Sequence, residues 1–316
     1  MMRVVPLWAA WLTVIVMATV FVFAGSGFDF EYVIPRRLVR LASIVIGGIC
    51  VALSSIVFQT LIGNRILTPA IMGYEGIYLF WQSMLLLVMG TQGLVMLGVS
   101  GNFAISIALV LAYSWALHRW VLRNSKGDVY QLLLLGLVLT MVIGTFTQFV
   151  QLRISPGEFA VFQGLSYASF NRAQPETLLY SGLAVSAVLL VGRKHLAELD
   201  VVALGRDQAI SLGVNHAGYV KLYLALIGVL VAISTSLIGP TAFLGIFVAN
   251  IAYALAGSNQ HRITLPLGCA IAIIIFLMAQ LLVEHIFNYR TTVSILVNLV
   301  CGAYFLLLAV RVRGSL

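Results

Sequence analysis

Long apolar runs, separated by short charged or glycine- and proline-containing stretches, follow one another along almost the whole chain. The runs are continuous and do not alternate between apolar and polar residues, which favours helices over the strands of a membrane barrel. A helix needs about 20 apolar residues to cross a bilayer. The pattern predicts an all-α integral membrane protein with about ten transmembrane helices, at approximately residues 7–24, 38–60, 70–89, 93–117, 129–152, 176–191, 221–237, 241–256, 264–286 and 292–310.

Composition agrees with a chain that is solvated mainly by lipid. Of its 316 residues 61% are apolar and 9% are charged, whereas a soluble domain carries about 25% charged residues. Ten spans leave no room for a large soluble domain, so residues 1–316 are expected to form a single transmembrane domain. The first apolar run is longer than the roughly 7–15 residues typical of a cleaved signal peptide, and we expect it to be the first span.

The lysines and arginines predict the orientation of the chain. If the N-terminus lies inside, twelve of them fall in cytoplasmic segments and six in outer segments, and basic residues concentrate on the cytoplasmic side of membrane proteins. Both termini are therefore expected in the cytoplasm. The cytoplasmic set is Arg3, Arg65, Arg119, Arg123, Lys126, Arg193, Lys194, Arg206, Lys221, Arg262, Arg311 and Arg313. The outer set is Arg36, Arg37, Arg40, Arg153, Arg172 and Arg290.

Several kinds of chemistry are not predicted. Cys50, Cys269 and Cys301 lie inside apolar runs at unrelated spacings, and the five histidines have no ligand spacing, so neither a disulfide framework nor a metal site is expected. The chain has no phosphate-binding loop for ATP and no catalytic constellation within its spans. Its basic residues are dispersed between the apolar runs, which argues against nucleic-acid binding. We expect no catalytic residue and no resident cofactor.

Three segments share motifs with a known family. The first runs from Arg37-Leu-Val-Arg40 through Phe58-Gln59 to Asn64 and Pro69-Ala-Ile-Met-Gly73. The second is Ala203-Leu204-Gly205, followed by Ala209 and Leu212-Gly213. The third is Gly239-Pro-Thr-Ala-Phe243-Leu-Gly245, followed by His261-Arg262 and Leu265-Pro266. In order and spacing they resemble the membrane permeases of ABC importers for iron chelates and cobalamin, across nearly the whole chain.

The sequence departs from this family's pattern at informative places. A family Pro-His pair is replaced by Ala249-Asn250, and the proline after the loop asparagine is replaced by Arg65. The residues Asn64 to Pro69 and Phe287 to Thr292 are more similar to the catecholate-siderophore branch than to the cobalamin branch. The resemblance thus implies an iron–siderophore permease in a bacterial inner membrane.

The resemblance assigns two contact regions. Arg37 and Arg40, three residues apart and therefore on one helical face, match family arginines that receive carboxylates of a periplasmic or lipoprotein siderophore-binding protein. The alternative is that both side chains only extend to the membrane interface. A third family arginine aligns with Glu284, so that assignment fails there, and Arg290 is the candidate substitute.

The longest internal loop, about residues 192–220, contains the second contact region. The resemblance identifies it as the coupling helix that contacts a separate ATPase subunit, and the alternative is an ordinary interfacial helix. The candidate coupling residues are Leu204, Gly205, Arg206, Asp207, Ala209, Ile210, Leu212 and Gly213.

Polar and aromatic residues near or inside the spans are candidates for the transport pathway. Carboxylates within a membrane are costly and are commonly functional, which singles out Glu75 and Glu284. Glu75 faces either the pathway or the interface. The pathway candidates are Phe58, Gln59, Glu75, Gln148, Gln151 and Asn298, although phenylalanines in spans usually pack and amides often bond neighbouring helices.

The predicted mechanism follows from these parts. A loaded binding protein docks on the outer arginines, a partner ATPase hydrolyses ATP, and a pathway between two permease subunits alternates its access. An unlike pair of permeases is favoured over a homodimer. The alternative is a secondary transporter driven by an ion gradient, which would need intramembrane ion sites.

Overall fold

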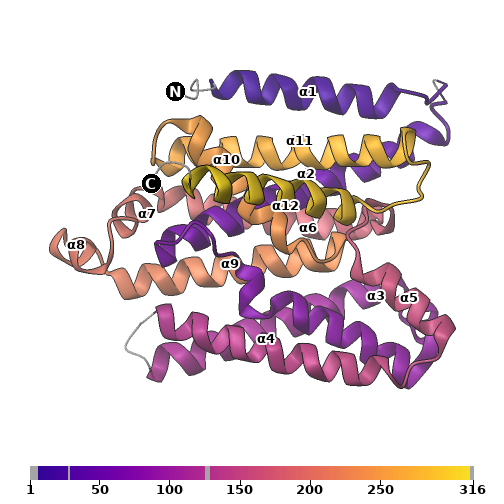
Figure 1. The fold of residues 1–316 in the computed structure, drawn as a ribbon, viewed down its shortest axis with the longest axis horizontal. Helices are drawn as coiled ribbons and strands as arrows, with labels where there is room; N and C mark the ends of the chain where they lie inside the picture. Colours follow the sequence, from indigo (N-terminus) through magenta and orange to yellow (C-terminus); the bar gives the residue numbers. More distant parts are fainter. Residues whose placement is uncertain (1–5, 28, 125–128, 314–316) are drawn as a thin grey trace.

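The computed structural model describes residues 6–27, 29–124 and 129–313. Arg3 and Lys126, two of the predicted topology signals, lie outside the described residues. Within the described part all regular structure is helical (Figure 1). The long helices are α1 (Leu7–Phe23), α2 (Val33–Ile62), α3 (Tyr74–Asn124), α4 (Val129–Gln151), α6 (Pro175–Lys194), α9 (His216–Ile238), α10 (Ala242–Ala256), α11 (His261–His285) and α12 (Val293–Arg313).

Short helices occupy the connections between the long ones. They are η1 (Pro69–Met72), α5 (Pro156–Ser166), η2 (Phe170–Arg172), α7 (Leu196–Val202) and α8 (Arg206–Ser211). The loop expected at about residues 192–220 is therefore shorter and more ordered than predicted, because α6 continues to Lys194 and α9 begins at His216.

The third and fourth predicted spans form a hairpin within the long helix α3. Gly90 and Gly98 have non-helical backbone angles with φ of 62° and 63°, and the two legs bond to each other. Trp81 Nε1 donates to Asn102 Oδ1 at 2.9 Å, and Tyr74 Oη lies 3.3 Å from His118 Nε2. The reversal covers residues 90–98, not the predicted 90–93, because residues 94–97 are apolar and look like the beginning of the next span.

Counting this hairpin as two spans gives a bundle that agrees with the sequence pattern. Six described helices are long and apolar enough to cross a membrane, one of them being the 46-residue α3 segment, and three shorter apolar helices accompany them. With the hairpin counted twice and the three shorter helices included, the described residues hold ten apolar helical segments, which is compatible with the predicted number of about ten.

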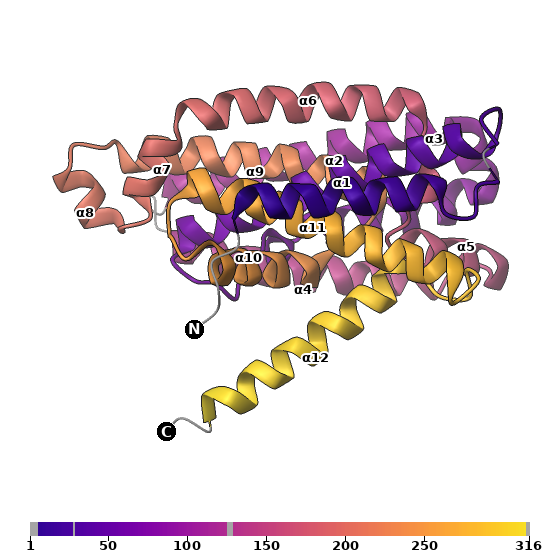
Figure 2. The same ribbon diagram turned by 90° about the horizontal axis from the view of Figure 1, so that it is seen from above.

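In the view of Figure 1 the long helices lie roughly along one common axis, with successive helices running in opposite directions, so the bundle has two ends. The start of α1 and the end of α12 lie at the end that carries α7 and α8, which we call the α8 end, and α5 lies at the opposite end, which we call the α5 end. Helix α2 lies in the middle, packed against α9 and α11. Figure 2 shows α6 on one side of the molecule and α12 leaning outward on the other.

Glycines let the central helices approach closely. A Cβ added at Gly48 of α2 would lie 2.9 Å from Ile273 Cγ1 and 3.2 Å from the main-chain nitrogen of Ile273 in α11. An added methyl therefore forces the Ile273 side chain to shift and presses on the main chain of α11 behind it. Close backbone approach at small residues is a common way for helices to associate in lipid.

Gly48→Ala is therefore expected to reduce the stability of the bundle. The added methyl overpacks the α2–α11 contact, which typically costs about 1–3 kcal/mol. The matched control is Gly182→Ala in α6, where the nearest described atom to an added Cβ is Ile46 Cδ1 at 4.0 Å. Thermal unfolding of the purified proteins in detergent measures the difference, and equal unfolding temperatures for the two variants would contradict the packing argument.

Candidate functional site

The structure brings Glu75 together with a break between two spans. Glu75 is in the first turn of α3, and α9 and α10 are separated by Gly239, Pro240 and Thr241. Glu75 Oε1 accepts a hydrogen bond of 2.9 Å from the main-chain N–H of Thr241. Because Thr241 is the N-cap residue of α10, the carboxylate lies at the positive end of a helix dipole, where negative charge is favoured.

The segment before α3 is held by side chains from two other spans. Thr140 of α4 donates to the carbonyl oxygen of Ile71 at 2.8 Å, and Tyr113 of the second α3 leg donates to the carbonyl oxygen of Met72 at 2.6 Å. These bonds satisfy main-chain groups that η1 leaves without helical partners, a necessity at membrane depth.

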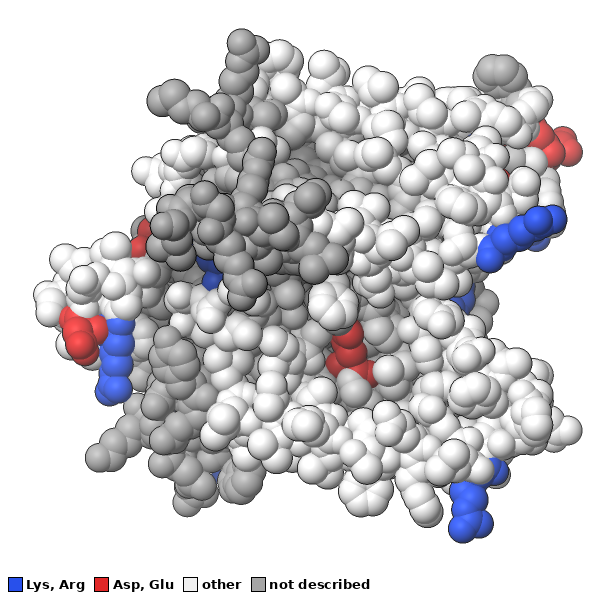
Figure 3. Space-filling model, viewed as in Figure 1, with Lys and Arg blue, Asp and Glu red and all other residues white. Residues whose placement is uncertain are grey.

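A cavity of about 170 Å³ opens beside Glu75. Thr241, Phe243, Ser294 and Asn298 contribute to its walls, so two of the predicted pathway residues, Glu75 and Asn298, share one site. Ser294 is already engaged, since its hydroxyl accepts a 2.6 Å hydrogen bond from the main-chain N–H of Ala168. Figure 3 shows an almost uncharged face between the two ends of the molecule, with one acidic patch in the area where Figure 1 shows α3 beginning.

The other predicted pathway residues lie elsewhere. Phe58 is fully buried in the core, and Gln59 is buried with its amide lacking a hydrogen-bond partner among the described residues. On α4, Gln148 is exposed and Gln151 is half-buried. None of these four lines the cavity beside Glu75.

The predicted coupling residues form a compact element at the α8 end. Leu204, Ile210 and Leu212 are all more than half exposed, at 54%, 54% and 62%, whereas Ala209 is fully buried. Arg206 and Asp207 are exposed in the first turn of α8. The segment from Leu204 to Gly213, which includes α8, thus projects with exposed apolar side chains, and its two charged side chains lie at the start of α8.

Two glycines bracket this projection. Gly205 has φ of 100° and Gly213 has φ of 81°, a region that side chains with a Cβ rarely occupy. Gly213 donates its main-chain N–H to the carbonyl oxygen of Ile210 at 2.9 Å. The sharp turns at both glycines set α8 apart from α7 and α9.

Helix α7 connects this element to the span bundle. Asp200 Oδ1 accepts from the main-chain N–H of His261 at 3.0 Å and lies 2.5 Å from His261 Nδ1. Tyr223 donates its hydroxyl to the carbonyl oxygen of His195. Asp200 therefore caps the first turn of α11 and binds its first side chain, which joins α7 to one of the central helices.

At the α5 end, Arg37 is largely committed within the chain. Its guanidinium donates to the carbonyl oxygens of Phe21 at 2.8 Å and Ala24 at 2.5 Å, which closes the C-terminal end of α1. Its side chain is 11% exposed. Arg40, which is more accessible, donates to Glu284 Oε1 at 3.0 Å and to the Tyr289 hydroxyl at 3.2 Å.

Glu284, which stands where the family resemblance implies an arginine, binds both predicted docking arginines. Its carboxylate lies 3.7 Å from Arg37 and 3.0 Å from Arg40, and it also accepts from the Gln280 amide at 3.0 Å. Arg290 is exposed in the connection between α11 and α12. The three predicted docking arginines thus share one end of the molecule but differ in how far they are free to bind a partner.

Comparison with known proteins decides the family. Residues 5–311 match the model of the FecCD transport family. The chain belongs to this family. It is 33% identical to the petrobactin import system permease protein YclO of Bacillus subtilis over 95% of both chains. It is 31% identical to the petrobactin import system permease protein FatC of Bacillus anthracis, over 90% of this chain and 81% of the relative.

More distant members and a solved structure agree with this membership. The hemin transport system permease protein HmuU of Yersinia pestis is 24% identical over 88% of this FecCD chain and 82% of its own length. The fold resembles a structure described as an inward-facing metal-chelate type ABC transporter, with a TM-score of 0.84 over 96% of this chain and 98% of that one, at 19% identity. The predicted multi-pass permease fold is confirmed.

Sequence reasoning missed the role of Asp200 and His261. His261 lay within a quoted motif, His261-Arg262 and Leu265-Pro266, without a function, and Asp200 lay in the charged loop. Their separation of 61 residues gave no sign of contact. Arg172, placed in the outer set, donates to the carbonyl oxygen of Gly164 at 2.9 Å and thereby caps α5.

Asp200→Ala is expected to loosen the connection between α7 and α11. Loss of the cap alone costs about 1 kcal/mol, and His261 loses its side-chain partner as well. Amide hydrogen exchange across residues 196–213 is expected to become several-fold faster. The matched control is Asp207→Ala, an exposed acid of α8 whose carboxylate has no hydrogen bond among the described residues. Exchange that is unchanged in Asp200→Ala would show that the pair does not anchor α7.

Proposed function

We propose that this chain is the permease subunit of an ABC importer that carries an iron–siderophore complex across a bacterial inner membrane. The observation that carries the proposal is its similarity to two petrobactin import permeases, at 33% and 31% identity over at least 90% of this chain. An ion-driven secondary transporter, the alternative from the sequence, has no support from the family.

The α8 end is the cytoplasmic side in this proposal. Basic residues that fall there include Arg193 and Lys194 at the end of α6 and Arg262 in α11, in keeping with the bias of cytoplasmic loops. The segment around α8 then projects Leu204, Ile210 and Leu212 into the cytoplasm, where a separate ATPase subunit covers them. ATP is bound and hydrolysed by that partner.

A second permease subunit packs against the face that contains the Glu75 cavity. Helix α12 leans away from the body and packs mainly on α10 and α11 (Figure 2), which leaves its exposed Ile295, Leu299 and Val300 uncovered. Another permease covers these side chains and encloses the pathway between the two subunits. We favour an unlike partner over a second copy of this chain.

The α5 end receives the siderophore-binding protein. Arg40 and Arg290 offer charge there, and an arginine can grip a carboxylate with two parallel hydrogen bonds. Arg37 belongs to the same cluster, but because its guanidinium closes α1, it contributes mainly by holding the end of α2 in place. In this proposal Arg40 and Arg290 contact the binding protein, and Arg37 has a structural role beside them.

The docking proposal is tested with the double variant Arg40→Glu and Arg290→Glu in the assembled transporter. Reversal of both charges is expected to lower binding-protein-stimulated ATP hydrolysis at least tenfold, while basal hydrolysis stays unchanged. Arg36→Glu is the control, since Arg36 is exposed at the same end and stacks 3.9 Å from the Tyr32 ring centroid. Stimulation of the double variant at the wild-type level would remove the arginines from the docking surface.

Coupling is tested by placing a charge on α8. Leu212→Asp is expected to release the ATPase subunit or abolish uptake, because it puts an ion into an apolar contact that the partner dehydrates. Ser211→Asp introduces the same charge one residue earlier, at an exposed position, and is expected to keep most of the activity. The measurements are co-purification of the ATPase and uptake of labelled ferric siderophore, and normal results for Leu212→Asp would contradict the assignment.

A further inference from the structure

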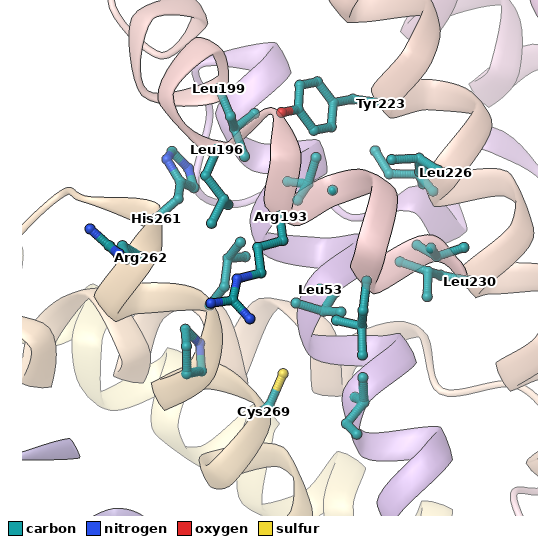
Figure 4. A pocket seen from close by; sticks show the side chains of 18 of the residues that line it. Leu53, Arg193, Leu196, Leu199, Tyr223, Leu226, Leu230, His261, Arg262 and Cys269 are labelled. Atoms are coloured by element: carbon teal, nitrogen blue, oxygen red, sulfur yellow. The ribbon is translucent and has the colours of Figure 1, made fainter. Parts of the chain in front are cut away.

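A second cavity, distant from Glu75, lies between the spans near the α8 end. It has a volume of about 520 Å³, within the range of about 300–1,000 Å³ usual for ligand sites. Helices α1, α2, α6, α9 and α11 contribute its walls, which are mostly apolar (Figure 4). Trp11, Leu53, Leu189, Leu226 and Leu230 are among the lining residues.

Two guanidinium groups stand at this cavity. Arg193, at the end of α6, and Arg262, at the start of α11, both line it and are both exposed. Within the part of the chain that the structure describes, neither makes an ion pair, and neither side chain makes a hydrogen bond. Figure 4 shows the Arg193 side chain reaching into the space between the helices, with Arg262 on the α11 side.

Helix α7 lines the cavity through Leu196 and Leu199, and its two carboxylates interact with other residues. Asp200 binds His261 at 2.5 Å, and Glu198 accepts from the Tyr219 hydroxyl at 3.1 Å. Both acids belong to α7, beside the cavity. The two arginines are therefore positive charges without an internal counter-charge, at the edge of an apolar space.

The position of the cavity favours lipid over protein as its occupant. It lies among α1, α6 and α11, whereas the face with α10 and α12 is on the other side of the molecule (Figure 2). The surrounding helices are transmembrane, so the apolar part of the cavity lies at membrane depth and its arginines at the boundary with water. Basic pockets between spans on the cytoplasmic side are suited to anionic lipid headgroups.

We propose that this cavity binds an anionic phospholipid of the inner leaflet. One acyl chain lies between Leu53, Leu226 and Leu230, and the phosphate bridges Arg193 and Arg262. The bound lipid thereby ties the end of α6 to the start of α11, directly beside the α7 contact with His261. The proposal rests on the proposed orientation, with the α8 end at the cytoplasmic side of the membrane, and is independent of the siderophore assignment.

Native mass spectrometry of the full chain, purified from bilayers containing phosphatidylglycerol and phosphatidylcholine, tests the site. Wild-type protein is expected to retain one phosphatidylglycerol in preference to phosphatidylcholine. Arg193→Gln with Arg262→Gln is expected to reduce that retention at least fivefold. Lys194→Gln with Arg206→Gln removes the same charge from exposed residues at the same end that do not line the cavity, and is expected to retain the lipid.

A second variant separates the acyl part from the headgroup part. Leu226→Trp fills the cavity without changing its charge and is expected to lower lipid retention as well. Equal retention by wild type and the double arginine variant would overturn the proposal, as would equal binding of phosphatidylcholine or displacement by millimolar inorganic phosphate. Cross-linking of a Leu189→Cys variant to a second copy, with no lipid retained by wild type, would make the cavity a subunit interface and would also overturn it.

Discussion

Main-chain polar groups inside a bilayer need partners within the protein, and this constraint governs the places where the helices of this permease are interrupted. Between α9 and α10 the chain leaves the helical path at Gly239, and the Thr241 N–H that follows is bound by Glu75. The loop before η2 also supplies a partner at this break, since Ser169 donates its N–H to the carbonyl oxygen of Ile238 at 2.8 Å. The polar main-chain groups that one helix break exposes are thus hydrogen-bonded by residues near another helix break.

The buried and half-buried charged residues at the α5 end likewise find partners within the protein. Glu284 is 5% exposed and binds Arg37 and Arg40 together, so none of the three is a buried, unpaired ion. Arg37 in turn closes α1. An arginine that a sequence motif marks for partner recognition therefore also does structural work, and Arg290, outside this cluster, keeps its charge available.

Much of the fold was predictable because lipid imposes a simple rule on sequence. Hydropathy located every span from α1 to α12, with displacements of five residues at the starts of α2 and α9 and of seven residues at the end of α3. It placed the reversal inside α3 too early, because residues 94–97 (Leu-Val-Met-Leu) are as apolar as the spans beside them. Hydropathy reports the solvent of a segment and not the direction in which the chain runs.

The candidate site was predictable only in part. The short motifs identified α8 and the exposed leucines on either side of it, because the order of small and apolar residues is a local property of the sequence. The partners of Glu75, Asp200 and Glu284 come from 166, 61 and 244 residues away along the chain, and no local pattern encodes such pairings. Phe58 illustrates the converse, since its place beside a motif gave no information about its burial in the core.

The outward lean of α12 affects which groups a single subunit exposes to the lipid. Beside that helix, the Glu75 cavity with Thr241 and Asn298 opens on a face that would otherwise meet hydrocarbon, where a carboxylate is costly. A copy without the proposed partner therefore bears the free-energy cost of a carboxylate-lined cavity that faces lipid. The second subunit proposed above would therefore, by covering this face, also remove the Glu75 cavity from contact with hydrocarbon.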